Sequence, residues 1–166
     1  MTGGKHKLPS TKPTGIQYGA LPWRLHGDEL QILLVTSRRT RRWIIPKGWP
    51  MDGLKPTAAA AREAKEEAGV LGDMSEATVG QYRYMKVLRN GSEMPCRVEV
   101  FPLKVTKERH DWDEMDARAR RWYSVTDAAA AVREPQLKAI IRRFGTRMVA
   151  EMRRKQSETV HGRPTA

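Results

Sequence analysis

Residues 43–70 read WIIPKGWPMDGLKPTAAAAREAKEEAGV, and this stretch decides the fold. Its apolar start, 43–45, predicts a short strand. The loop that follows contains Gly48, where a bare backbone lets a ligand or metal approach closely. The alanine-rich segment from Pro56 predicts a helix that ends at Gly69, because alanine is the best helix former and glycine a common C-terminal cap. The stretch therefore predicts a strand–loop–helix unit.

Three carboxylates crowd one side of this helix. At 100° per residue, Glu66 and Glu67 lie about 60° and 40° to either side of Glu63. Like charges at these spacings repel each other, and acids near a helix C-terminus oppose the helix dipole. Two interpretations stay open at this point. The acids form either a solvated helix face or a site for a hard divalent cation such as Mg²⁺, whose charge would remove the repulsion.

A basic loop, 37–42, lies directly before this stretch. Its arginines are Arg38, Arg39, Arg41 and Arg42. Charge runs are commonly solvated loops. The alternative is a phosphate clamp, because the guanidinium fork matches phosphate oxygens in a bidentate way.

The rest of the chain predicts strands around this unit and helices against them. A hairpin is expected from 18–25 and 30–36, and Asn90-Gly91 indicates a second hairpin between 78–88 and 97–105. Another short strand is expected at 122–125. The order of elements predicts an α+β, three-layer arrangement.

Three local signals concern the second half of the chain. The i,i+4 spacing of Glu114 and Arg118 predicts an ion pair if the loop 107–121 contains a helical turn. Ser124 or Thr126 is expected to cap a short helix over 127–132. Residues 136–152 form an amphipathic pattern whose apolar stripe is expected to pack on the core.

Composition bounds the domain organisation and the partners. A chain of 166 residues predicts one domain, over 16–152, between flexible basic tails at 1–15 and 153–166. The formal net charge of +12 favours polyanionic partners. The single cysteine, Cys96, excludes an intramolecular disulfide and fits a reducing cytoplasm, and no run is long enough to span a membrane.

The stretch 43–70 resembles the sequence box of the Nudix hydrolases: Gly, five residues, Glu, seven residues, Arg-Glu-aliphatic-x-Glu-Glu-x-Gly-aliphatic. The matching positions are Gly48, Arg62, Glu63, Glu66, Glu67, Gly69 and Val70. Leu54 departs from the box, which has its first glutamate there; in the family that residue mostly supports the loop or the box arginine and can contribute to metal binding. Looser motifs across about residues 17–145, such as Trp112-x-Glu114-x-x-x-Arg118, resemble the diphosphoinositol polyphosphate phosphohydrolase branch and its bacterial relatives.

The resemblance implies a Nudix-like α/β/α sandwich around a mixed sheet. It also implies a Mg²⁺-dependent hydrolase, with Mn²⁺ as a substitute, that cleaves phosphoanhydride bonds in nucleoside diphosphate-linked or polyphosphorylated substrates. Dinucleoside polyphosphates are the first expectation and diphosphoinositol polyphosphates the second. A nucleotide- or RNA-binding module with little or no turnover is the alternative, supported by Leu54 and the positive charge.

The resemblance also implies residue roles. Glu63 and Glu67 are expected as metal ligands, together with Glu66 and the backbone carbonyl of Lys47. Glu66 is expected to act as the base, with Glu63 as the other candidate, and Arg62 to orient the carboxylates. The expected substrate contacts are Arg24, Arg38, Arg39, Arg41, Arg42 and Gly48, and Tyr82 and Tyr84 either stack on a base or pack in the sheet. The expected partner is a polyanionic phosphorylated small molecule. Nucleic acid is not required, no membrane partner is expected, and the oligomeric state is not predicted.

Overall fold

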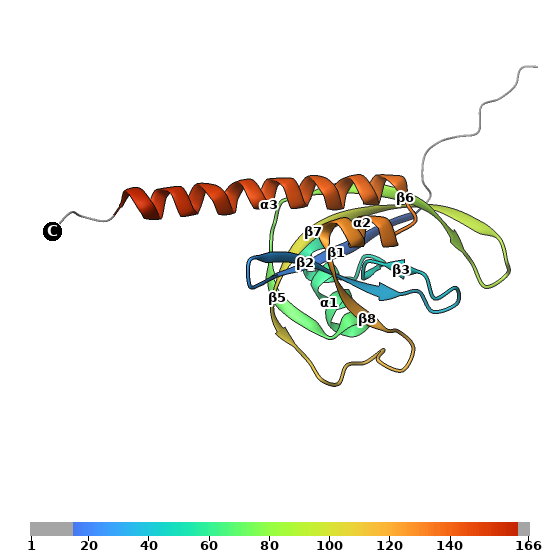
Figure 1. Ribbon diagram of the computed structural model, residues 1–166. Coiled ribbons are helices and arrows are strands. Elements are labelled where there is room, and N and C mark those ends of the chain that lie inside the picture. The colour runs from blue at the N-terminus through green and yellow to red at the C-terminus, as the bar shows by residue number, and fades with distance from the viewer. Residues whose placement is uncertain (1–14, 163–166) are drawn as a thin grey trace, which may run out of the picture.

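A mixed eight-stranded sheet organises the computed structural model, which describes residues 15–162 (Figure 1). Five strands form its main path in the order β3-β2-β1-β7-β5, while β4, β6 and β8 pair with β1, β7 and β2. The strands are β1 (Gly15–His26), β2 (Glu29–Thr36), β3 (Trp43–Ile44), β4 (Lys47–Gly48), β5 (Val70–Met74), β6 (Gly80–Val87), β7 (Glu93–Glu108) and β8 (Arg120–Ser124). Strands β1 and β7 run parallel, and every other pair is antiparallel.

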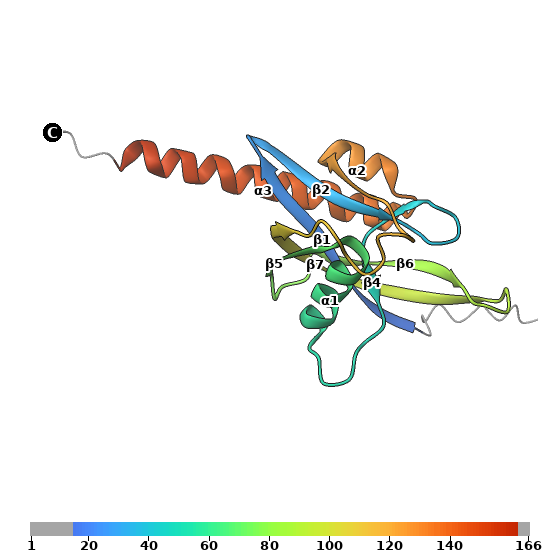
Figure 2. The ribbon, with the colours of Figure 1, turned by 90° about the horizontal axis from the view of Figure 1, so that it is seen from below.

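Helices cover both faces of the sheet (Figures 1 and 2). Helix α1 (Pro56–Ala68) packs on one face through Ala60, Ala64 and Ala68, which join a buried cluster with β-strand residues. Helices α2 (Val125–Ala131) and α3 (Pro135–His161) pack on the other face and form a second cluster around Ile140 and Phe144. The predicted α+β sandwich is therefore confirmed.

Several local predictions are confirmed as well. Both hairpins form, and Gly91 takes the left-handed φ of 82° that the turn between β6 and β7 requires. Ser124 caps α2, because its hydroxyl oxygen accepts a hydrogen bond from the Asp127 N–H at 3.1 Å. Gly69 ends α1 in the left-handed conformation, with φ 65°.

Two boundaries differ from the prediction. Gly72 and Asp73, whose residue types are typical of a turn, instead lie within β5, because Gly72 lets the strand continue past a register shift close to the Lys104 carbonyl. Helix α3 continues to His161, so the expected flexible tail from 153 is wrong for residues 153–161. This segment holds strong helix formers and neither glycine nor proline before Gly162. The other expected tail, 1–15, lies outside the described residues except for Gly15.

Within residues 15–162, the structure has no helix with the length and apolar character needed to cross a bilayer.

Candidate active site

The predicted carboxylates lie where α1 meets the turn after β3. Strand β4 pairs with β1 through Tyr18–Gly48 and Gly19–Lys47, which fixes the backbone of this turn against the helix. A Cβ placed on Gly48 would lie 2.1 Å from Glu63 Oε1. Only glycine therefore lets the backbone approach the Glu63 carboxylate this closely.

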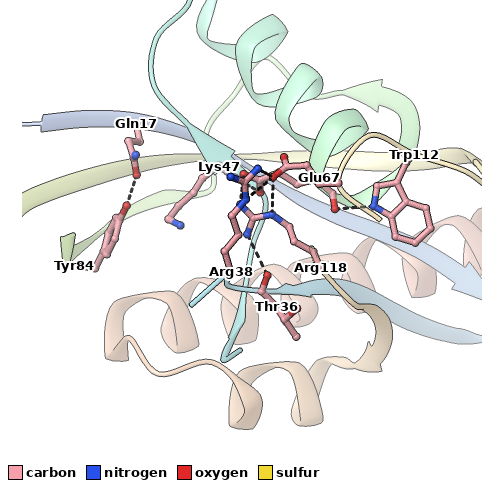
Figure 3. Close-up of polar contacts among 9 residues, drawn as sticks. Gln17, Thr36, Arg38, Lys47, Glu67, Tyr84, Trp112 and Arg118 are labelled. Atoms are coloured by element: carbon pink, nitrogen blue, oxygen red, sulfur yellow. Dashed lines mark hydrogen bonds and ion pairs between the residues drawn. The ribbon is translucent and has the colours of Figure 1, made fainter. Parts of the chain in front are cut away.

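Glu67 is the buried centre of the site (Figure 3). Its side chain is 7% exposed, and Oε2 accepts a hydrogen bond of 3.2 Å from the Lys47 N–H. Oε1 pairs with Arg118 Nη2 at 3.3 Å. Burial raises the pKa of Glu67 to about 8, although Arg118 and Lys47 oppose the shift; Glu63 and Glu114 add to it. Burial, then Glu66 and Glu114, also raises the pKa of Glu63, and a hydrogen bond links the Glu63 and Glu67 side chains.

Glu66 stands at the outer edge of the same arc. Its side chain is 36% exposed, and Arg62 Nε lies 3.4 Å from its carboxylate. Arg62 is thus beside the residue that it was expected to orient. Leu54, which stands where the box has its first glutamate, is 38% exposed.

The loop between β7 and β8 closes the site from the opposite side. Arg118 bonds Glu67, Glu114 at 3.2 Å and the Thr36 carbonyl at 3.1 Å, and the Glu114 carboxylate also holds Arg38. Trp112 donates its indole N–H to the Glu67 carbonyl. The predicted Glu114–Arg118 pair is confirmed. The contact between Arg118 and Glu67 was not predicted, because sequence spacing indicates neighbours on one helical turn and not contacts between residues 51 positions apart.

The expected substrate arginines are dispersed. Arg38 reaches the site through Glu114, whereas Arg42 pairs with the buried Glu134 at 2.6 Å. Arg24 forms a separate network with Gln31, Glu108 and Trp122. Arg39 and Arg41 are exposed.

A second group of side chains lies on the other side of β4. Lys47 precedes Gly48 in β4, so the strand pleat points its side chain away from Glu63, and Trp49 directly follows the strand. The Lys47 ammonium lies 4.9 Å from the Tyr84 ring centroid, and that of Lys86 lies 5.9 Å from Trp49. We call Lys47, Trp49, Tyr84 and Lys86 the aromatic–lysine cluster. Burial lowers the pKa of Lys47 to about 8, although Glu67 opposes the shift.

The expected role of the two tyrosines needs a correction. Tyr82 is 1% exposed and packs in the core, so it is not accessible to stack on a base. Tyr84 is half-buried, and its hydroxyl donates to Gln17 at 2.5 Å. Trp49, which was not predicted as a site residue, is 40% exposed.

The donor set fits a hard divalent cation. Burial raises the pKa of both Glu63 and Glu67, which disfavours their ionised forms, and a bound cation would offset this cost. Within residues 15–162, no three acidic, histidine or cysteine side chains gather closely enough to hold a metal ion alone. Mg²⁺ commonly takes one or two carboxylates and completes its shell with waters and substrate phosphates, so two touching glutamates suffice.

Comparison with known proteins agrees with this geometry. The family model of the NUDIX domain matches residues 17–144. Nudix hydrolase 12, mitochondrial, of Arabidopsis thaliana is 34% identical, covering 81% of this chain and 68% of that protein. Diphosphoinositol polyphosphate phosphohydrolase 3-alpha of Mus musculus is 36% identical, covering 65% of this chain and 63% of that protein. The solved structure of a C. elegans Ap4A hydrolase binary complex has a TM-score of 0.62 at 19% identity, over 82% of this chain and 98% of that chain, so it shows a shared fold.

Proposed function

Because this chain belongs to the Nudix hydrolase family, we propose that it hydrolyses phosphoanhydride bonds of dinucleoside polyphosphates with the help of a divalent cation. The family and the enzyme class predicted from the sequence are confirmed. The observation that carries the proposed reaction is the Glu63–Glu67 pair. Gly48 leaves space for the Glu63 carboxylate beside the turn, and Arg118 forms an ion pair with Glu67.

Glu63 and Glu67 would hold the cation, preferably Mg²⁺, with the Lys47 carbonyl as a further oxygen donor. A bound Mg²⁺ would neutralise phosphate charge and lower the pKa of a water. Glu67 is kept in place by the Lys47 N–H and by Arg118, so its carboxylate is oriented before substrate arrives.

Glu66 is the proposed base. Its side chain is more accessible to water than that of Glu67, since Glu66 is 36% exposed and Glu67 is 7% exposed. Arg62 holds its carboxylate at 3.4 Å while leaving it open to water. Glu66 takes one proton from the attacking water, whose oxygen forms the new P–O bond, and the anhydride P–O bond breaks to release a phosphate-bearing leaving group.

The aromatic–lysine cluster supports a substrate that contains a base. The half-exposed Trp49 ring offers a flat surface on which a nucleobase can stack, while the Lys47 and Lys86 ammonium groups beside the rings match phosphate oxygens. An inositol ring carries no aromatic face to stack. This difference favours dinucleoside polyphosphates over diphosphoinositol polyphosphates as the proposed substrate.

The test is a Mg²⁺ hydrolysis panel with a dinucleoside polyphosphate, a diphosphoinositol polyphosphate, ADP-ribose and capped RNA, read by anion-exchange chromatography. Glu67→Gln should lower turnover about 100- to 1000-fold with an unchanged circular dichroism spectrum. Glu76→Gln, at an exposed bend, is the matched control with full activity. Full activity of Glu67→Gln would refute the proposal, and binding without turnover in the wild type would favour the binding module.

The same panel tests the choice of substrate. Trp49→Ala should raise the KM for the dinucleoside polyphosphate about tenfold, because stacking on an aromatic ring is worth about 1–3 kcal/mol per base. Trp49→Phe should restore most of the affinity, and hydrolysis of a diphosphoinositol polyphosphate should not change. Equal losses on both substrates would show that Trp49 acts through the structure of the loop.

A further inference from the structure

The last part of α3 lies outside the family match. The NUDIX match ends at residue 144, while α3 continues to His161. Gly145 is the last buried residue of the helix. Met148 still packs partly against the core, and beyond it the helix projects past the sheet and the other helices, as both ribbon views show (Figures 1 and 2). At 1.5 Å per residue the projecting part is about 20 Å long.

One face of this helix carries arginines. We define the arginine face as Arg142, Arg143, Arg147, Arg153 and Arg154, all of which are exposed. At 100° per residue the five fall within about 140° of arc, centred roughly opposite the buried stripe. They extend over about 18 Å along the helix axis.

These arginines have no acidic partner in the part of the chain that the structure describes. Within residues 15–162, no ion pair joins any of the five to a carboxylate, and the aromatic contact of Arg147 is with Phe144. Glu151 and Glu158 lie outside the arginine face, towards the buried stripe, and both are i,i+4 to an arginine without pairing with it. The guanidinium groups are therefore free to bind an external anion.

The chemistry of the face favours a phosphate backbone over a lipid surface. Thr146, Ala150 and Ser157 separate the arginines. Helices that lie in a membrane interface carry tryptophan, phenylalanine or leucine opposite the basic face. On α3 the large apolar side chains that are exposed are Val149 and Val160, which lie at one edge of the arginine face. Two valines bury little apolar surface in a lipid bilayer.

We propose that the arginine face of α3 binds the phosphate backbone of nucleic acid without reading its sequence. A row of arginines about 18 Å long contacts several successive phosphates, and the net charge of +12 steers a polyanion towards the protein. This surface is separate from the Glu63–Glu67 site and does not depend on the proposed hydrolysis.

The test is binding of fluorescein-labelled single-stranded RNA of random sequence, and of DNA of the same length, to the full chain in EDTA. Fluorescence anisotropy is recorded from 0.05 to 0.5 M salt. The variant is Arg147→Gln/Arg153→Gln/Arg154→Gln. The matched control is Lys65→Gln/Lys107→Gln/Arg109→Gln, which removes the same charge from exposed positions elsewhere.

Each phosphate contact to a single strand contributes about 0.7 to the slope of log K against log salt. Losing three contacts should therefore reduce the slope by about 2 and weaken binding about 100-fold at 0.1 M salt. The control variant should lose much less affinity, and its salt slope should change much less. RNA and DNA should behave alike if only the backbone is contacted.

Equal losses in the two variants would overturn the proposal, because the effect would then belong to net charge alone. The proposal would also be overturned if the wild-type protein bound phosphatidylserine vesicles but bound neither the RNA nor the DNA. A concentration-dependent dimer in sedimentation that the arginine variant abolishes, without nucleic acid binding, would show that the face joins two copies instead. Circular dichroism of the variant checks that α3 remains helical.

Discussion

At the scale of single residues, Gly48 determines how the site is built. Its neighbour Lys47 points to the other side of the pleated β4, so the turn presents the Lys47 side chain to Tyr84 and bare backbone to Glu63. Glycine is required at position 48 because it has no side chain and not because of its backbone conformation, since a Cβ would lie 2.1 Å from Glu63 Oε1.

Gly48→Ala should therefore displace Glu63 from Glu67 and lower turnover about 100-fold, because small misplacements of catalytic groups have effects of this size. Thermal unfolding should change little, since Glu63 can rotate towards solvent. Steady-state kinetics and differential scanning calorimetry measure the two quantities.

Gly27→Ala is the matched control. Gly27 has φ 62° and open space around it, so alanine there costs about 1–2 kcal/mol of stability through its left-handed conformation and leaves the site untouched. A Gly48→Ala enzyme with wild-type turnover would contradict the predicted geometry.

Residue spacing predicted part of this site and missed the rest for a physical reason. The helical period fixes the directions of Glu63, Glu66 and Glu67, so their shared face could be read from the sequence. The partners of Glu67 come from Arg118 and Lys47, which are 51 and 20 residues away, and only the folded sheet brings them together. Trp49 was passed over for the same reason, because Lys86 lies on another strand.

At the scale of elements, the loop between β7 and β8 is held on the C-terminal end of α1. Trp112 and Arg120 donate to the carbonyls of Glu67 and Ala68, and Glu114 donates its backbone N–H to the Glu66 carbonyl. Arg118 adds its side chain, which is 11% exposed, between Glu67 and Glu114. The loop thus satisfies carbonyls at the helix end and supplies the counter-charge for the buried acid.

Arg118→Met should destabilise the protein by about 1–3 kcal/mol, because it leaves the Glu67 and Glu114 carboxyl groups without their shared hydrogen-bond donor. Arg118→Lys keeps the charge but loses the fork that reaches three oxygens, so an intermediate loss is expected. Urea unfolding measures both variants.

Arg62→Met is the stability control for this prediction. Arg62 is 58% exposed, and an exposed i,i+4 pair contributes about 0.5 kcal/mol or less. If Arg118→Met and Arg62→Met lost the same stability, Arg118 would not be the anchor of the loop.

The extent of α3 shows why element boundaries were harder to predict than element types. The apolar stripe ends near Met148, which packs against the core, and the prediction ended the helix at 152. Beyond it, helix formation depends on intrinsic propensity rather than burial, and arginine, lysine, glutamine and glutamate supply that propensity. A helix end that is predicted from amphipathic periodicity therefore falls where the buried stripe ends.

At the scale of the whole molecule, the sheet separates two packed clusters and leaves buried ionisable groups near its turns. The layers could be predicted from the order of strands and helices. The strand order could not, because the parallel pairing of β1 with β7 joins residues about 80 positions apart. Strand β1 also pairs with β4, which carries Lys47 and Gly48, so the fold and the site share this central strand.

The buried acid makes the stability of the metal-free protein depend on pH. The pKa of Glu67 is about 8 in the folded protein against 4.5 for an ordinary glutamate. Between these values the unfolded carboxyl loses its proton while the folded one keeps it, so the free energy of unfolding should fall as pH rises. At about 1.4 kcal/mol per pKa unit the fall is at most about 5 kcal/mol. Lys47, with its pKa lowered to about 8, contributes the opposite slope only above that pH.

Urea unfolding in EDTA at pH 5, 6, 7 and 8 checks this prediction. The stability of the wild type relative to Glu67→Gln should decrease steadily over the series, because glutamine does not titrate. Added Mg²⁺ should flatten the decrease, since a cation held by Glu63 and Glu67 favours the ionised carboxylate that burial disfavours. A difference that stays constant with pH in EDTA would mean that Glu67 ionises normally, and the raised pKa that supports the cation site would be wrong.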